Sequence, residues 1–159
     1  MYPDSAQNLN YETDDAVYFF STAYDPLNNW SAHQVKIWGQ VFPTLEHAYH
    51  YKKFDQQNPE IAKRILETPS PWAAMQIERQ HKSKRRTDWQ QVKISIMEEL
   101  CRAKLDQNED MRERLMATGI KNIYENSPWD EFWGHAQGKG QNQMGKILMK
   151  LREELKNGE

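Results

Sequence analysis

Helix-start signals recur along most of this chain, and they limit it to a mainly helical fold. Six side chains that can cap a helix N-terminus each precede a stretch with helical periodicity: Thr44, Asn58, Ser70, Thr87, Asn108 and Asn142. Two of them are followed by proline at the first helical position, where proline is tolerated. The spacing predicts helices over about 44–57, from 59, over about 71–81, 88–106 and 108–118, and from 142 to the C-terminal region.

Strand signals are fewer and shorter. Residues 16–22, AVYFFST, are rich in aromatic and β-branched side chains and predict a strand. Residues 35–38 and 41–42 flank Gly39-Gln40, which predicts a hairpin with a type II′ turn. Residues 120–125 predict one more short strand. Together these patterns indicate an α+β fold, mainly α-helical with a small antiparallel sheet, as a single domain over 16–159 behind a flexible tail at 1–15.

Composition sets limits on location and partners. No apolar run approaches the roughly 20 residues that span a bilayer, and the polar, acidic start does not resemble a signal peptide, so we expect a cytoplasmic protein without a membrane partner. The formal net charge of −2 argues against general affinity for nucleic acid. One basic cluster stands apart: Lys82, Lys84, Arg85 and Arg86. We favour a solvated loop for it over a phosphate clamp or a nucleic-acid edge, although nucleic acid stays a possible partner.

Metal chemistry finds little support in the sequence. The single cysteine, Cys101, excludes an internal disulfide and a Cys-rich zinc site, and its helical surroundings predict a buried apolar residue. His47 and His50 are three residues apart beside Glu46, whereas the zinc metalloprotease motif needs two histidines four apart. We therefore expect no metal ion and no cofactor.

Two segments carry the residue types that chemistry needs. In residues 43–54, Glu46, Tyr49 and Lys53 fall on one helical face, so that a carboxylate and an amine could act as an acid/base pair or form an ordinary ion pair. Residues 130–145 combine tryptophan with a glycine-rich loop before a helix, a pattern that can expose backbone N–H groups to an anion. The residues alone favour an ion pair in the first segment and core packing in the second.

The ordered set of motifs resembles the NADAR, or YbiA-like, family. The resemblance rests on P-T-x-E-H-x-Y-x-x-x-K-F at 43–54, D-W-x-x-V-K-x-x-I-M at 88–97 and D-x-F-W-G-x-x-x-G-K-G-x-N-x-x-G-x-x-L-M-x-x-R at 130–152, together with Phe20-Ser21 and Thr118-Gly119. It spans about residues 17–156 and implies a YbiA-like fold. It also implies an N-glycosidase, a hydrolase that cleaves the C–N bond between a ribose and a base. Expected small-molecule substrates are phosphoribosyl-pyrimidine intermediates of riboflavin synthesis or ADP-ribosylated guanine.

The resemblance also assigns roles to residues. It implies catalytic parts for Glu46 and Asp130, whose carboxylates suit a cation-like sugar, and for Lys53 as an imine-forming amine, with Lys93 and Lys104 as rivals. The residues expected to bind substrate are Trp89 and Trp133 by stacking on the base, Gly134, Gly138, Gly140 and Asn142 around the phosphate or ribose, and Arg152 by its charge.

The chain departs from the family pattern at three places, and these leave its substrate open. Residues 48–51 replace a common aromatic-aromatic-Gln-Ala run, Glu78-Arg79 stands where Gly-Arg is usual, and Asn28-Asn29-Trp30 stands for Ser-Asn-Phe. Two alternative functions remain: a non-catalytic module that binds ADP-ribose or NAD, and an antitoxin-like protein that removes ADP-ribose from DNA. The sequence does not indicate an oligomeric state.

Overall fold

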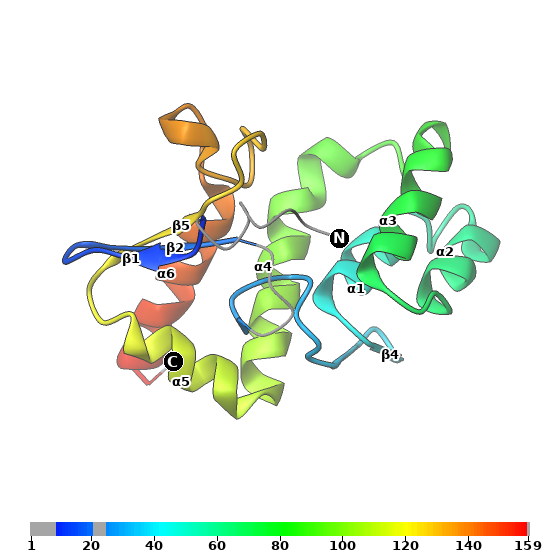
Figure 1. Ribbon diagram of the computed structural model, residues 1–159. Helices are drawn as coiled ribbons and strands as arrows, with labels where there is room; N and C mark the ends of the chain where they lie inside the picture. The colour runs from blue at the N-terminus through cyan, green and yellow to red at the C-terminus, as the bar shows by residue number, and fades with distance from the viewer. Residues whose placement is uncertain (1–8, 21–24, 159) are drawn as a thin grey trace. The chain divides into compact units, whose positions relative to one another are not determined.

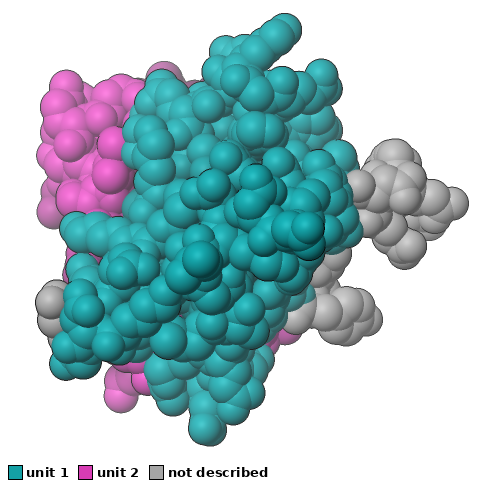
Figure 2. All heavy atoms as spheres, turned by 90° about the vertical axis from the view of Figure 1, so that its left-hand side faces the viewer, with its two compact units in different colours: residues 1–28, 109–159 teal, residues 29–108 magenta. Residues whose placement is uncertain are grey.

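The computed structural model describes residues 9–20 and 25–158. The chain divides into two compact units, one formed by residues 1–28 and 109–159 and the other by residues 29–108 (Figure 2).

The first unit is built on a three-stranded sheet with the order β1-β2-β5. Strand β1 (Tyr11–Glu12) pairs antiparallel with β2 (Ala16–Phe19), and β5 (Asn122–Glu125) pairs parallel with β2. Helix α6 (Gln143–Lys156) packs against β5 (Figure 1). The period of this helix predicts an apolar stripe of Met144, Ile147, Leu148, Leu151 and Leu155; the first four are buried, and Leu155 is half-buried.

The outer positions of the same sheet carry a ladder of tyrosines. Tyr11, Tyr18 and Tyr124 are cross-strand neighbours, and their rings stack with centroids 4.5 Å and 5.0 Å apart. Such cross-strand aromatic pairs stabilise a sheet. Strand β1 lies inside the segment predicted as a flexible tail, so Tyr11 and Glu12 of that segment belong to the sheet; residues 1–8 lie outside the described residues.

Helix α5 (Glu109–Ala117) connects the second unit to β5. It ends at Thr118-Gly119, where Gly119 adopts a φ of 62°, the left-handed conformation typical of a glycine that ends a helix. Lys156 of α6 donates to the Gly119 carbonyl at 2.9 Å.

The second unit consists of a hairpin and four helices. Strands β3 (Val35–Ile37) and β4 (Gln40–Phe42) form the hairpin. Helices α1 (Leu45–Lys52), α2 (Pro59–Leu66) and α3 (Pro71–Gln80) pack against one another at the right-hand side of Figure 1, and the 3-10 helix η2 (Lys82–Lys84) leads to α4 (Trp89–Gln107). Helix α4 contacts both α1 and β3.

The three short helices share one apolar core. Its buried side chains are Phe54, Ile61, Ala62, Ile65 and Ala74, with Tyr51 and Ile77 packed against them. Burial of a large aliphatic or aromatic side chain contributes about 1.5–3 kcal/mol to folding. This core therefore fixes the end of α1, where Lys53 lies, against α2 and α3.

The predicted fold class is confirmed, and several local details differ. The sheet is not wholly antiparallel, because β2 and β5 run parallel. Trp38 and Gly39 form the hairpin turn with φ of 54° and 74°, one residue earlier than predicted, and two positive φ values are typical of a type I′ turn. Ser21 and Thr22 of the first predicted strand lie outside the described residues.

Several predicted helix starts are satisfied differently from the expectation. The Asn58 side chain makes no capping bond and donates to the Lys84 carbonyl at 2.9 Å. Thr87 does not cap α4: Asp88 directly precedes the helix, and its carboxylate binds Arg86. Asn142 precedes α6 but makes no capping bond, because its side chain is held by β5. The caps at Thr44 and Ser70 are confirmed, with their hydroxyls accepting the N–H groups of the third residues along.

The single thiol is completely buried in α4, as predicted. Burial raises the pKa of Cys101 to about 12, so this thiol is protonated and unreactive in the folded protein. Within residues 9–20 and 25–158, the structure has no helix with both the length and the apolar character needed to cross a membrane.

Candidate active site

Glu46 lies at the second position of α1 and is held on three sides. Thr44 caps the helix, and the Glu46 N–H donates to the Asn29 carbonyl at 3.1 Å. One carboxylate oxygen of Glu46 lies 2.8 Å from His50 Nε2, one helical turn later, and the indole of Trp30 donates a further hydrogen bond. The carboxylate is thus oriented by neighbours and only 13% exposed.

These neighbours decide the charge of Glu46. Burial by itself raises the pKa of a carboxyl group, but His50, Lys53 and the Trp30 hydrogen bond favour the anion and together hold the pKa of Glu46 below its ordinary value. The carboxylate is therefore ionised at neutral pH. Such a group suits electrostatic stabilisation of a developing positive charge, or proton abstraction, better than proton donation.

Lys53 lies directly after the last residue of α1 and continues its helical backbone. Its amine is 4.6 Å from the ring centre of Tyr49 and 5.4 Å from that of Trp89, and the residue is only 4% exposed. Nζ also lies 3.2 Å from a carboxylate oxygen of Glu78 on α3. The sequence-based prediction that Glu46, Tyr49 and Lys53 share one face agrees with these contacts, and Glu46 and Lys53 influence each other's charge.

Burial shifts the pKa of Lys53 far from that of a surface lysine. Burial lowers it, Glu78 and Glu46 raise it, and Arg85 lowers it, so that the pKa of Lys53 falls to about 8. An amine with this pKa is partly neutral near physiological pH, which is the condition for nucleophilic attack on a carbonyl-like carbon.

His47 lies beside Glu46 in sequence but has a structural role. It is fully buried, its Nε2 lies 3.1 Å from the Thr68 carbonyl and its Nδ1 lies 2.8 Å from the Thr44 hydroxyl. A carbonyl can only accept, so Nε2 carries the proton and Nδ1 accepts from the hydroxyl. With both nitrogens engaged, His47 is not placed to bind a metal ion, and no group of three or more potential metal ligands gathers anywhere in the described parts of the chain.

Asp130 lies in the first unit and organises its own loop. Its Oδ1 accepts the N–H groups of Phe132 and Trp133 at 3.0 Å and 2.9 Å. The Asp130 N–H in turn donates to the Ser127 hydroxyl at 3.1 Å. A catalytic role for Asp130 stays a prediction. The structure shows that one of its carboxylate oxygens already accepts two hydrogen bonds within the loop.

The glycine-rich loop is held as a compact structure by its own backbone. Carbonyls of Phe132 and Trp133 accept the N–H groups of Gln143 and Met144 at the start of α6, each at 3.1 Å. The first two amides that this helix N-terminus could offer to an anion are therefore occupied. Contact of Gly138 with substrate stays a prediction; it is exposed and has a φ of 92°.

Three glycines of the motif are required by close packing. A β-carbon at Gly134 would collide with the Glu125 side chain, and one at Gly140 with the Gly134 carbonyl. At Gly145 it would collide with the Ile123 carbonyl and the Asn142 side chain. This packing explains much of the glycine content of the motif without a ligand; binding of substrate by Gly134 and Gly140 stays a prediction.

Asn142 and Arg152 hold β5 and the turn before it. The Asn142 side chain accepts from the Glu125 N–H at 3.0 Å and donates to the Ile123 carbonyl at 2.8 Å. Arg152 is buried and donates to the Thr118 hydroxyl at 2.9 Å and to the Lys121 carbonyl at 2.6 Å. Both residues have structural tasks, and contact of either with substrate remains a prediction.

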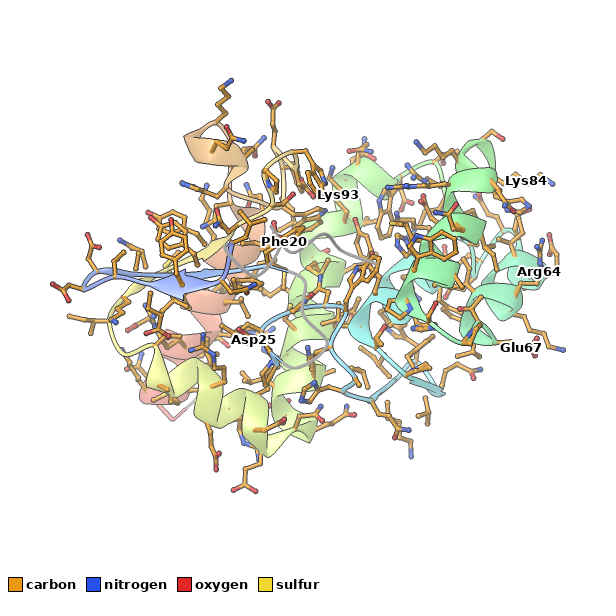
Figure 3. The ribbon with its side chains drawn as sticks, in the orientation of Figure 1. Phe20, Asp25, Arg64, Glu67, Lys84 and Lys93 are labelled. Carbon is orange, nitrogen blue, oxygen red and sulfur yellow. The ribbon has the colours of Figure 1, made fainter. Side chains whose placement is uncertain are left out.

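The tryptophans and the rival lysines occupy different environments. Trp89 is buried with its ring edge-on to Tyr49 at 5.2 Å, whereas Trp133 is half-buried and packs edge-on to Phe132 at 4.8 Å. Lys104 is fully buried and donates to the Ser31 hydroxyl at 2.8 Å. Lys93 is half-buried on α4 (Figure 3). Lys53 is in electrostatic contact with Glu46.

The basic cluster is partly neutralised within the chain. Arg85 pairs with Glu78, and Arg86 pairs with Asp88 through two hydrogen bonds of 2.6 Å and 3.0 Å. Lys82 and Lys84 are exposed. This arrangement agrees better with a solvated loop than with four cations gathered around a phosphate.

Sequence reasoning missed Trp30, His50 and Glu78 as neighbours of the candidate residues. His50 is four residues after Glu46, a spacing that places two side chains on the same face of a helix, so its pairing was accessible from the sequence. Glu78 and Trp30 come from other elements, and their only signal was that both stand at departures from the family pattern.

Comparison with known proteins now identifies the family. Residues 10–156 match the NADAR domain. The chain is 34% identical over 158 residues to the N-glycosidase YbiA of Escherichia coli, a match that covers 96% of this chain and 97% of that protein. This chain belongs to the NADAR family.

Other comparisons agree with this assignment. The solution structure of E. coli YbiA matches with a TM-score of 0.79 at 28% identity, covering 96% of this chain and 92% of that one. The N-glycosidase Npun_R5314 of Nostoc punctiforme is 36% identical over 145 residues, covering 89% of this chain and 93% of that protein. A riboflavin biosynthesis protein of Vibrio vulnificus, VVA0006, is 32% identical over 130 residues, which is 81% of this chain and 35% of that protein. The two full-length relatives carry the name N-glycosidase, so this NADAR protein is a hydrolase of that class.

Proposed function

We propose that this NADAR protein hydrolyses the C–N bond between a phosphorylated ribose and a pyrimidine base, on phosphoribosyl intermediates of riboflavin synthesis. The observation that carries the proposal is an ionised, oriented Glu46 in electrostatic contact with an amine, Lys53, whose pKa lies near 8. The name of the Vibrio relative supports the choice of substrate class. ADP-ribosylated guanine, which shares the ribosyl C–N bond, is the competing substrate.

Each group has a task in this reaction. As the base leaves, positive charge develops at the anomeric carbon, and the Glu46 carboxylate stabilises it. The neutral Lys53 amine adds to that carbon with its lone pair, the bond to the base nitrogen breaks, and the departing nitrogen takes up a proton. The lysine nitrogen, having given one proton to the base, is now part of a glycosylamine. Its lone pair breaks the ring C–O bond at the anomeric carbon, the ring oxygen takes up the remaining N–H proton, and the imine so formed is hydrolysed by water to the free sugar and the amine.

Trp89 and Asp130 complete the proposal. Trp89 borders the Lys53 amine and offers an aromatic surface for the base. Asp130 is proposed as a second carboxylate on the strength of the motif that it begins, and its Oδ1 retains its loop hydrogen bonds. Roles for Trp133, Gly138, Asn142 and Arg152 in binding the phosphate or the ribose are proposed from the same motif.

The test is release of free base by the purified protein, without added metal. The protein is incubated separately with a phosphoribosylaminopyrimidine and with an ADP-ribosylated guanine nucleotide, and free base is followed by chromatography. We expect turnover of the first substrate. Release of base only from the ADP-ribosylated guanine nucleotide would show that this is the substrate class instead. Release from neither substrate would refute the proposed function.

Glu46→Gln tests the residue assignment. Loss of an electrostatic stabiliser costs about 10²–10³-fold in rate, and we expect a loss of that size with the fold unchanged by circular dichroism. The matched control is Glu60→Gln, because Glu60 occupies the same second helical position in α2 but is exposed. A Glu46→Gln rate close to that of the wild type would remove Glu46 from the mechanism.

A further inference from the structure

A single buried carboxylate in the second unit joins three segments of the chain. Glu78 comes from the third turn of α3, and its side chain is 4% exposed. It contacts the Lys53 amine at the end of α1, at 3.2 Å, and forms an ion pair with Arg85, which follows η2. Two cations thus share one buried anion, the carboxylate of Glu78.

Stability alone gives no good reason for such an arrangement. Removing charged groups from water costs several kcal/mol per ion, and an apolar replacement of similar volume is often as stable or more so. The helices around Glu78 already share an apolar core through Ile61, Ile65 and Ala74. A task in the candidate active site explains the buried carboxylate better than a task in the core.

The geometry around the amine shows what that task is. The Lys53 side chain ends between two aromatic rings, at 4.6 Å from Tyr49 and 5.4 Å from Trp89, and Glu78 is the anion that it contacts directly. Without an anion at this position, a long flexible amine would be free to turn toward Glu46 or toward solvent. Glu78 therefore fixes the direction from which the amine approaches a substrate.

We propose that Glu78 is a positioning residue, which holds the Lys53 amine between Tyr49 and Trp89 and, together with Arg85, sets the charge on that amine. This role of Glu78 depends on the proposed N-glycosidase function only for the reaction of the Lys53 amine with a substrate. The clamp itself, formed by Lys53, Glu78 and Arg85, is a property of the folded chain.

The charges near the amine act in opposite directions. Glu78 and Glu46 stabilise the protonated amine, while Arg85 disfavours it. His50 adjoins both carboxylates and favours their anionic forms. Other charged groups at the end of α1 pair among themselves: Lys52 with Asp55 at 2.8 Å, and Arg86, whose backbone N–H donates to the Lys53 carbonyl at 2.8 Å, with Asp88. Tyr49 and Trp89, which border the amine, are neutral.

Two substitutions should therefore shift the titration of Lys53 in opposite directions. Glu78→Gln keeps the shape of the side chain and removes the anion, so the amine loses its proton at lower pH. Arg85→Gln removes a cation, so the amine keeps its proton to higher pH. An opposite charge at this distance shifts a pKa by about one unit or more, which is a tenfold or larger change in the protonation equilibrium.

The experiment is a direct titration of Lys53 in the full-length protein. The 13Cε chemical shift of Lys53 in lysine-labelled protein, assigned with Lys53→Arg, is followed against pH in the wild type, in both single variants and in the double variant. We expect midpoints displaced downward for Glu78→Gln and upward for Arg85→Gln, with the double variant between them. The control is Lys84→Gln, because Lys84 is exposed and points outward (Figure 3), and its midpoint should equal that of the wild type.

The titration and the enzyme assay separate the two proposals. Midpoints that do not move, or that move in the same direction in both single variants, would overturn the clamp whatever the enzyme does. Displaced midpoints without any base release would sustain the clamp and refute the glycosidase. With both intact, the pH dependence of kcat/KM should move with the midpoints, whereas a purely structural Glu78 would lower the rate equally at every pH. If Glu78→Gln does not fold, Arg85→Gln, at a side chain that is 27% exposed, still decides by the direction of its shift.

Discussion

Asp130 can be tested for structure and for chemistry with two substitutions at one position. Its Oδ1 accepts two backbone N–H groups, of Phe132 and Trp133, in the manner of a helix cap. Asp130→Ala removes both bonds, and loss of such a cap costs about 0.5–2 kcal/mol. For a chain of this size, each kcal/mol shifts Tm by about 2–4 °C, so we expect Tm to fall by roughly 1–8 °C.

Asp130→Asn separates the two roles, because its amide oxygen can still accept both N–H groups while the negative charge is gone. We expect Tm to stay within about 1 °C of the wild type, and base release to fall by about 10²-fold or more. Stability is followed by thermal circular dichroism and activity by chromatography of the free base. The control is Glu131→Gln, an exposed carboxylate next in the same loop, which should change neither.

The possible results are distinct. Wild-type activity in Asp130→Asn would show that Asp130 only organises its loop, and would leave Glu46 as the single catalytic carboxylate of the proposal. Wild-type stability in Asp130→Ala would refute the argument that the two loop hydrogen bonds stabilise this region.

Two further predictions concern the glycine-rich motif and the basic cluster. Gly145→Ala places a β-carbon against the Ile123 carbonyl and should lower the free energy of unfolding by about 1–3 kcal/mol in urea denaturation, while Lys146→Ala, at an exposed site of the same helix, should have little effect. Equal stability of the two variants would contradict the packing argument. Replacing Lys82 and Lys84 by glutamine should leave hydrolysis of a free nucleotide substrate unchanged; a loss confined to a DNA-linked substrate would contradict the view that this loop is only solvated surface.

Local signals predicted the helices of this chain well because their causes are local. The hydroxyls of Thr44 and Ser70 bind amides three residues away, and the apolar stripe of α6 follows from its period. Predictions failed where a side chain bound a partner distant in sequence instead of the adjacent helix N-terminus. The Asn142 side chain could cap α6, but two hydrogen bonds to β5 engage it instead.

The candidate site shows the same division between local contacts, which the sequence predicts, and tertiary contacts, which it does not. Glu46, Tyr49 and Lys53 share one helical face because of their spacing, so periodicity predicted their proximity. Periodicity could not predict that Glu78 of α3 meets Lys53, because a contact between helices depends on tertiary packing. The sequence likewise could not separate the roles in the glycine-rich motif, in which close backbone packing and ligand binding favour the same residue type.

The burial of Cys101 provides a way to measure how often α4 opens in the folded protein. The chain has one thiol, it is inaccessible in the folded state, and its raised pKa keeps it from forming a thiolate. A thiol-specific reagent can therefore modify the protein only during excursions that expose the middle of α4. The rate at which the reagent modifies Cys101, measured by mass spectrometry, then reports how often α4 opens. No engineered label is needed.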